Sequence, residues 1–425
     1  MLCRHISLLV LTVGSTDGLE HYHDAPRRVD LGNSVLISNL RNRYQENKPI
    51  TLGEAITSTW QFHATDKRDL IFALLGIVRM SKPADAADDL VVDYSLPEEK
   101  VFEQATRYLW KVEKSYGHIL DVVVPDSTVL ASRSSPSWRP DYRLRSRPPL
   151  AFWATPHGLS FSLGGGYRQS PCNWQGDLMG NAELRIVAAY IDQVEKCGEP
   201  IKQWRTSSGF LNSLEIIYGM PKTYFNGQHR LEVFWRTLIC NTWPKGPVIP
   251  APADAATSFK DWILCTHFAN FNGALVEGKP FGLVSAYMID LLRDEEYDVI
   301  PNVFPFTIVP HPRSPTTHVL QPGASFHHAV QHFEDMQLFV TKRGYLGLGP
   351  ATLQPGDTIW GTEFSRWLYA MRDVLSGESQ KTKQFVGAVY AHGLTDGEFL
   401  ETVVDIEVIG KTVSKSVGYD IFDVV

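Results

Sequence analysis

Two histidines in the segment "SFHHAVQHFED" have the spacing of a metal-binding pair. His328 and His332 are four residues apart, so a helix can present both imidazoles to one zinc ion. A metalloprotease signature needs glutamate directly after the first histidine, where this chain has Ala329. A zinc site also needs a third ligand, which the sequence does not identify. We interpret the pair as weak metal candidates and expect no bound metal; the alternative is an enzyme whose site is assembled around His327, His328 and His332.

The segment "GALVEGKP", residues 273–280, has the G-x-x-x-x-G-K spacing of a phosphate-binding loop. Pro280, however, replaces the Ser or Thr whose hydroxyl binds magnesium, and Glu277 would add a negative charge beside a phosphate. The preceding "THFANFN" is typical of a helix, whereas the motif follows a strand. The segment therefore predicts no nucleotide site.

A second glycine-rich segment, "TKRGYLGLGPATLQPGDTIWG", spans residues 341–361. Pro350 and a further Pro-Gly turn leave no helix N-terminus to face a phosphate. We predict tight turns between short strands, with Gly344 in a hairpin turn. Gly347 and Gly349 are expected to let neighbouring backbone pack closely. No cofactor is predicted.

Arginines alternate with aromatic residues in "SWRPDYRLRSR", a composition that can bind single-stranded nucleic acid. The chain as a whole is acidic, with a net charge of −7, whereas nucleic-acid-binding domains normally carry an excess of positive charge. There is no G-x-S-x-G motif and no cysteine in a protease-like context. The sequence therefore predicts no nucleic-acid partner and identifies no catalytic residue.

The cysteines and the apolar segments indicate the cellular compartment in which the protein is expected. The 5 cysteines are far apart and form no C-x-x-C pair, so neither a disulfide framework nor a zinc knuckle is indicated. The longest apolar stretch, "ISLLVLTVG", is shorter than the roughly 18 residues that a membrane-spanning helix needs. We predict a cytoplasmic protein without a membrane span.

Helical patterns dominate the first third of the chain. In "TLGEAITSTW", Thr51 and Glu54 have capping-box spacing. In "SLPEEKVFEQATRYL", Ser95 is the expected N-cap, and apolar residues recur on one helical face. Between these segments, "TDKRDLIFALLGI" predicts a buried helix capped by Thr65 and ending near Gly76.

The later segments predict strands on either side of a helical region. Runs such as "ELRIVAAYIDQVEKCG" are typical of strands, and the last 90 or so residues are mostly strand and turn. We therefore predict an α+β fold: a mainly helical segment over 1–145, a β-rich segment over 146–199, a helical insertion over 200–336, and a small antiparallel β-unit, twisted or barrel-like, over 337–425. The strands before the insertion are expected to join the sheet that follows it.

Three segments in this order resemble the fungal heterokaryon incompatibility (HET domain) family. "ATDKRDLIFALLGI" is similar to its D-x-R-D-x-hydrophobic-A-L-L-G block, "DYS" to a block that opens a helix, and "SWRPDY" to its S-W-x-P-D-aromatic block. The matching residues are Asp66, Arg68, Asp69, Ala73, Leu74, Leu75, Gly76, Asp93, Tyr94, Ser95, Ser137, Trp138, Pro140, Asp141 and Tyr142. Near the end, "LFVTKRGYLGLGPATLQPGDTIW" and "FVGAVYAHGLTDGEFL" resemble two further family segments. Their matching residues include Gly344, Gly347, Gly349, Gly356, Asp357, His392, Gly393, Asp396, Gly397 and Glu398.

The resemblance implies a role in allorecognition and programmed cell death, with protein partners. Family members usually begin with the HET domain proper, which is thought to be related to TIR folds and lies upstream of the D-x-R-D block. Only residues 1–65 precede that block here, and we recognise none of the early HET motifs in them. We expect residues 1–145 to be a remnant or C-terminal part of such a region, in a non-enzymatic recognition or regulatory protein without the effector domain. Besides the enzyme named above, a protein-binding scaffold is the alternative.

Overall fold

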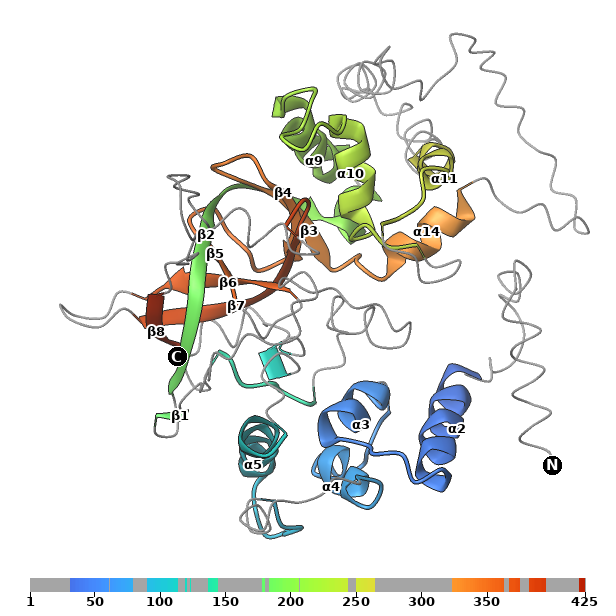
Figure 1. The fold of residues 1–425 in the computed structure, drawn as a ribbon, viewed down its shortest axis with the longest axis vertical. Helices are drawn as coiled ribbons and strands as arrows, with labels where there is room; N and C mark the ends of the chain where they lie inside the picture. The colour runs from blue at the N-terminus through green and yellow to red at the C-terminus, as the bar shows by residue number, and fades with distance from the viewer. Residues whose placement is uncertain are drawn as a thin grey trace, which may run out of the picture. The chain divides into compact units, whose positions relative to one another are not determined.

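A computed structural model gives the fold (Figure 1). It describes residues 31–60, 62–78, 90–113, 119–120, 123, 137–143, 178–179, 183–205, 207–243, 250–263, 323–362, 367–374, 382–394 and 420–424. The chain divides into two compact units. Unit 1 comprises Met1–Ser115, Asp141–Arg147 and Phe306–Gln321, and unit 2 comprises Tyr116–Pro140, Pro148–Pro305 and Pro322–Val425. The segments "ISLLVLTVG" and "GALVEGKP" lie outside the described residues.

Unit 1 is helical in its described part, with α2 (Leu31–Gln45), α3 (Leu52–Ser58), α4 (Asp69–Leu75) and α5 (Glu98–Lys111). The capping box predicted for α3 is present: the Glu54 amide donates to Thr51 Oγ1 and the Thr51 amide donates to Glu54 Oε2, both at 3.1 Å. The predicted apolar face of α5 is buried, and it consists of Val101, Phe102, Ala105, Tyr108 and Leu109.

The starts predicted for α4 and α5 are wrong by a few residues. The N-cap of α5 is Pro97, in extended conformation, and not Ser95. The Ser95 amide donates to Asp93 Oδ1 at 2.8 Å, a local turn that competes with the helix, and a residue before proline disfavours helical backbone. The N-cap of α4 is likewise Arg68 rather than Thr65.

The main feature of unit 2 is a closed six-stranded barrel. Its strands are β2 (Glu183–Pro200), β3 (Met336–Thr341), β4 (Leu346–Pro350), β5 (Thr358–Gly361), β6 (Leu368–Asp373) and β7 (Thr382–Ala391). Antiparallel pairing runs in the order β2-β3-β4-β7-β6-β5 and returns to β2. The short strands β1 (Leu178–Met179) and β8 (Asp420–Val424) pair with β2, and β8 also pairs with β7.

The long strand β2 closes the barrel. Ala189 to Gln193 pair with β5, and Val194 to Pro200 pair with β3, with register shifts along both ladders. Such irregularities bend a strand and increase its twist, which lets one strand serve both neighbours. The expectation that a strand before the insertion joins the later sheet is therefore confirmed.

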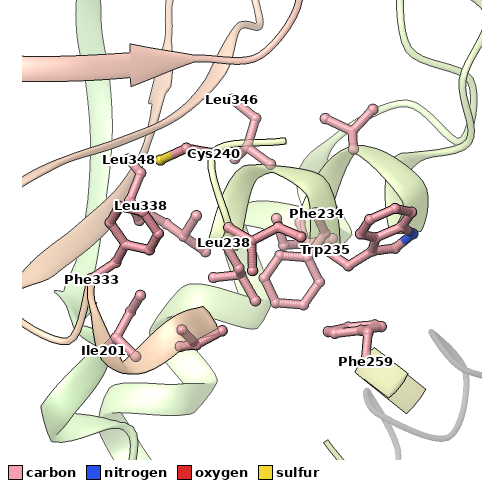
Figure 2. Packing of buried hydrophobic residues seen from close by; sticks show 14 of the residues in the cluster. Ile201, Phe234, Trp235, Leu238, Cys240, Phe259, Phe333, Leu338, Leu346 and Leu348 are labelled. Atoms are coloured by element: carbon pink, nitrogen blue, oxygen red, sulfur yellow. The ribbon is translucent and has the colours of Figure 1, made fainter. Parts of the chain in front are cut away.

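The helical insertion between β2 and β3 packs on the outside of the barrel. Its described helices are η2 (Ile201–Arg205), α9 (Ser207–Gly219), α10 (Arg230–Leu238), α11 (Ala255–Ile263) and α14 (Ala324–Gln331). Outward side chains of the barrel, such as Leu346 and Leu348, share one buried cluster with Leu238 and Cys240 of the insertion (Figure 2). Burial of this apolar surface fixes the insertion to the barrel. The α+β prediction with a helical insertion and a barrel-like C-terminal unit is confirmed.

None of the helices in the described ranges has the length and apolar content of a membrane span.

Candidate functional site around the barrel wall

The interior of the barrel is filled by a second cluster that includes the ring of Phe339. A barrel of eight strands leaves an interior just wide enough for side chains, so six strands leave less room. Gly347 faces the Phe339 ring: a Cβ at this position would lie 2.3 Å from Phe339 Cζ and 2.4 Å from the Tyr390 carbonyl oxygen. At Gly349 a Cβ would lie 2.9 Å from Leu353 Cδ2. The close approach of neighbouring backbone that was predicted is thus present at Gly347, whereas at Gly349 the close neighbours are side chains.

The turns of the same glycine-rich segment are equally specific. Gly344 has φ +91° between β3 and β4, in the hairpin turn expected there, and Gly356 has φ +97° before β5. Both values lie in the left-handed region, which glycine occupies without a steric cost. The whole segment is accounted for by turns and by packing inside the barrel.

Asp357 fastens the turn before β5 to the neighbouring strand β6. Its two carboxylate oxygens accept from Nε and Nη2 of Arg372, each at 2.8 Å, and Oδ2 also accepts from the Gln354 amide at 2.8 Å. The Asp357 side chain is 2% exposed. Arg372 in turn donates to the Thr352 carbonyl oxygen at 2.8 Å, and the hydrogen bond to Asp357 raises the pKa of the guanidinium. Such a two-point ion pair fixes geometry more strongly than a single contact.

His392, at the end of β7, is the centre of a buried polar network that ties the barrel to the insertion. Its Nδ1 lies 2.9 Å from the hydroxyl of Tyr390, and its Nε2 lies 2.6 Å from Gln228 Oε1. Gln228 Nε2 donates to Glu232 Oε1 at 3.2 Å, and the same oxygen accepts from Arg236 Nε at 2.8 Å. The network thus runs from the barrel into α10.

These contacts determine the protonation of the imidazole. Because Gln228 Nε2 donates to a carboxylate, its Oε1 faces His392, so Nε2 of His392 is the donor and Nδ1 accepts from Tyr390. Burial, and next the charge of Arg236, lower the pKa of His392 to about 3. Both ring nitrogens are hydrogen-bonded, so His392 is a neutral imidazole that ties the barrel to the insertion, and the lone pair of its Nδ1 accepts from Tyr390.

Tyr224 makes a second connection beside this network. Its hydroxyl donates to the His392 carbonyl oxygen at 3.2 Å and accepts from the Leu346 amide at 3.0 Å. Burial raises the pKa of the phenol far above its ordinary value. Tyr224 and Gln228 give no local signal in the sequence, and only the fold brings them to His392.

The histidine cluster of α14 has a different environment. Trp262 Nε1 donates to His327 Nδ1 at 3.2 Å, and Gln331 Nε2 lies 2.9 Å from His327 Nε2. The rings of His328 and His332 lie 5.2 Å apart between centroids. Among the residues that the structure describes, no group of three or more His, Cys, Asp or Glu side chains is arranged to hold a metal.

In unit 1 the D-x-R-D and D-Y-S residues come together at Arg68. Its guanidinium donates to Asp66 Oδ2 at 2.7 Å and to the backbone carbonyl oxygens of Tyr94 and Leu96, the latter at 3.0 Å. The Tyr94 hydroxyl donates to Asp69. The hydrogen bond from Arg68 lowers the pKa of Asp66. The cluster fastens the start of α4 to the turn before α5, while Gly76 is the C-cap of α4 with ordinary helical backbone.

The S-W-x-P-D-aromatic segment is divided between the units. Ser137, Trp138 and Pro140 belong to unit 2, where Ser137 Oγ accepts from the Phe385 amide of β7 at 2.8 Å. Asp141 belongs to unit 1 and accepts from Arg143 Nη2 at 2.8 Å. Asp396, Gly397 and Glu398 lie outside the described residues.

The chain thus contains a closed, antiparallel six-stranded β-barrel with a helical insertion between β2 and β3. Residues 316–407 match the Het-6 beta-barrel domain family; this range contains β3 to β7, whereas β2, which closes the barrel, precedes it. A 77-residue stretch is 34% identical to heterokaryon incompatibility protein 6, OR allele, of Neurospora crassa, and covers 18% of this chain and 11% of that relative. The chain is thus similar, over its barrel region, to fungal heterokaryon incompatibility proteins, and it matches about a tenth of that relative's length. No solved structure matches it.

Proposed function

We propose that the chain is a non-enzymatic recognition or regulatory protein in fungal allorecognition and the programmed cell death linked to it, acting through protein partners. The main support is that the described residues of the C-terminal family-like segments have structural roles in the barrel. Gly347 and Gly349 make room inside it, Asp357 fastens a turn, and His392 is neutral with both nitrogens bonded. Each of these residues is used in building a rigid barrel, which can present a recognition surface.

Expression in a filamentous fungus tests the proposal. The chain is produced alone, and a full-length heterokaryon incompatibility protein is produced in parallel as the toxic control. We expect the chain alone to leave growth unchanged, and its affinity purification to recover a protein partner in a fixed ratio. Strong cell death caused by the chain alone, or an absence of any protein partner, would count against the proposal.

A further inference from the structure

We propose that Phe225 and the tip of the β3–β4 hairpin form a docking surface for a protein segment that carries an apolar side chain next to acidic residues. We call this the Phe225 surface, and it consists of Phe225, Lys342, Arg343, Tyr345 and Gly393. The inference rests on the recognition role proposed above and specifies the site that performs it. All five residues belong to unit 2.

The loop that carries Phe225 is held by hydrogen bonds on both sides of it. The Tyr224 amide donates to the Gln228 carbonyl oxygen at 2.8 Å, and the Gly227 amide donates to the Tyr224 carbonyl oxygen at 2.9 Å. Asn226 Oδ1 accepts from the Gln228 amide at 3.1 Å. Because Tyr224 and Gln228 are also bonded to the His392 region, the loop is fixed to the barrel as well as to itself.

The Phe225 ring is exposed and yet held in place. The residue is 56% exposed, although the Tyr224 ring lies 3.9 Å away and the Tyr345 ring 4.7 Å away between centroids. Gly393 lies under its edge: a Cβ at Gly393 would be 3.2 Å from Phe225 Cε2. An exposed aromatic ring that is already ordered loses little conformational entropy on binding, which is the property of an interface anchor.

The charges beside this ring indicate the chemistry of the partner. Lys342 and Arg343 are exposed at the hairpin tip, and Arg343 Cζ lies 5.8 Å from the centroid of the Tyr345 ring. The Arg343 amide donates to Asp192 Oδ2 at 2.8 Å, which fixes the tip. The whole chain has a net charge of −7, whereas the hairpin tip carries two adjacent cations. A positive rim around an apolar anchor is complementary to an acidic segment with an apolar side chain.

The geometry favours a protein segment over nucleic acid. Single-stranded nucleic acid binds to several aromatic platforms along a strongly basic groove. Here one side of the Phe225 ring is already covered by Tyr224, and two cations are supplied by the hairpin. Binding of an oligonucleotide or of an anionic membrane at this surface would therefore contradict the proposal.

The experiment selects peptides from a random displayed library on the purified full chain, at low salt. An enriched peptide is then synthesised with a fluorescent label, and its affinity is measured by fluorescence polarisation. We expect enriched peptides to combine Asp or Glu with an apolar or aromatic residue. Phe225→Ser should weaken binding about tenfold or more, and Arg343→Glu should weaken it and reduce its salt dependence.

Tyr190→Ser is the matched control, because Tyr190 is a comparably exposed aromatic side chain on β2, at 47%. It should leave the affinity unchanged, and circular dichroism should show all three variants folded. The proposal is overturned if no acidic peptide is enriched, if Phe225→Ser binds as tightly as the parent chain, or if labelled oligo-dT or phosphatidylserine vesicles bind and lose binding in Phe225→Ser. If a protein partner recovered from the fungus still binds Phe225→Ser, this surface is wrong while the recognition role stands; absence of any partner removes both.

Discussion

Replacing Gly347 by alanine tests whether the glycine-rich segment exists to pack the barrel. The added methyl group would lie 2.3 Å from Phe339 Cζ and 2.4 Å from the Tyr390 carbonyl oxygen. Favourable contacts between carbon atoms need about 3.5–4.0 Å, so the contact with Phe339 is too short by about 1 Å or more. The contact with the carbonyl oxygen, at 2.4 Å, is also shorter than a Cβ can tolerate. Phe339 can shift only inside a filled barrel, and the Tyr390 backbone belongs to the β4–β7 ladder, where Leu348 pairs with Tyr390.

The expected loss of stability follows from this geometry. Overpacking of a filled core typically costs about 1–3 kcal/mol, and a clash with fixed backbone belongs at the upper end of that range. We expect a loss of about 3 kcal/mol or more in the free energy of unfolding. For a folding unit of nearly 300 residues, a loss of about 3 kcal/mol lowers the midpoint of thermal unfolding by roughly 5 °C.

Urea and thermal unfolding followed by circular dichroism provide the measurement. Gly344→Ala is the matched control: it introduces the same methyl group at φ +91°, where no atom lies within 4 Å, and should cost about 1–2 kcal/mol through backbone strain. Phe339→Leu combined with Gly347→Ala should recover part of the loss, because it removes the clash with the ring and leaves the clash with the Tyr390 carbonyl oxygen. If Gly347→Ala is as stable as Gly344→Ala, the packing argument is refuted.

Three further expectations concern the polar contacts. The pKa of about 3 for His392 lies below its ordinary value, so below about pH 6.5 the unfolded chain binds a proton at this residue while the folded chain does not. The free energy of unfolding should therefore fall as the pH drops from 6.5 towards 3, by about 2 kcal/mol at pH 5. His392→Gln should flatten this dependence, measured by urea titration at several pH values. Asp357→Asn removes the charge that faces Arg372 and should lower the free energy of unfolding by about 2–3 kcal/mol. Asp335→Asn, in an exposed pair with Lys202, should lower it by less than about 1 kcal/mol. Equal losses would contradict a structural role of the Asp357–Arg372 pair. Arg68→Lys cannot reproduce the forked contacts to Asp66 and two carbonyl oxygens, so it should lower the free energy of unfolding of unit 1, and an unchanged value would argue against the cluster.

Features set by neighbouring residues could be predicted from the sequence. The capping box of Thr51 and Glu54 and the turn at Gly344 depend on a few adjacent positions, and both are present. The start of α5 differs from the prediction because Leu96 precedes Pro97 and therefore disfavours helical backbone, while Ser95 belongs to a local turn with Asp93. Local patterns therefore give the elements well and their ends less well.

Features set by distant residues could not be predicted in detail. The alternation in "ELRIVAAYIDQVEKCG" predicts a strand, but its bend and its two pairing partners depend on β3 and β5, which follow the whole insertion. His392 is separated from Gln228 by 164 positions, and a glutamine in a polar loop carries no signal of burial against a histidine. The partners of the network were therefore missed, although His392 itself belongs to a segment that resembles the family.

Gly347 and Gly393 belong to the two C-terminal segments that resemble the family, and their surroundings differ. Gly347 lacks a side chain because Phe339 occupies the barrel interior, so its requirement for glycine follows from barrel closure. Gly393, by contrast, lies under the exposed ring of Phe225, where a methyl group would press on a side chain at the surface. A substitution at Gly347 should therefore act on stability through packing. One at Gly393 should displace the Phe225 ring and weaken binding, and it should also strain the backbone, because Gly393 has φ +80°. Within the described barrel, the surface where the insertion meets the β3–β4 hairpin is the place to look for function.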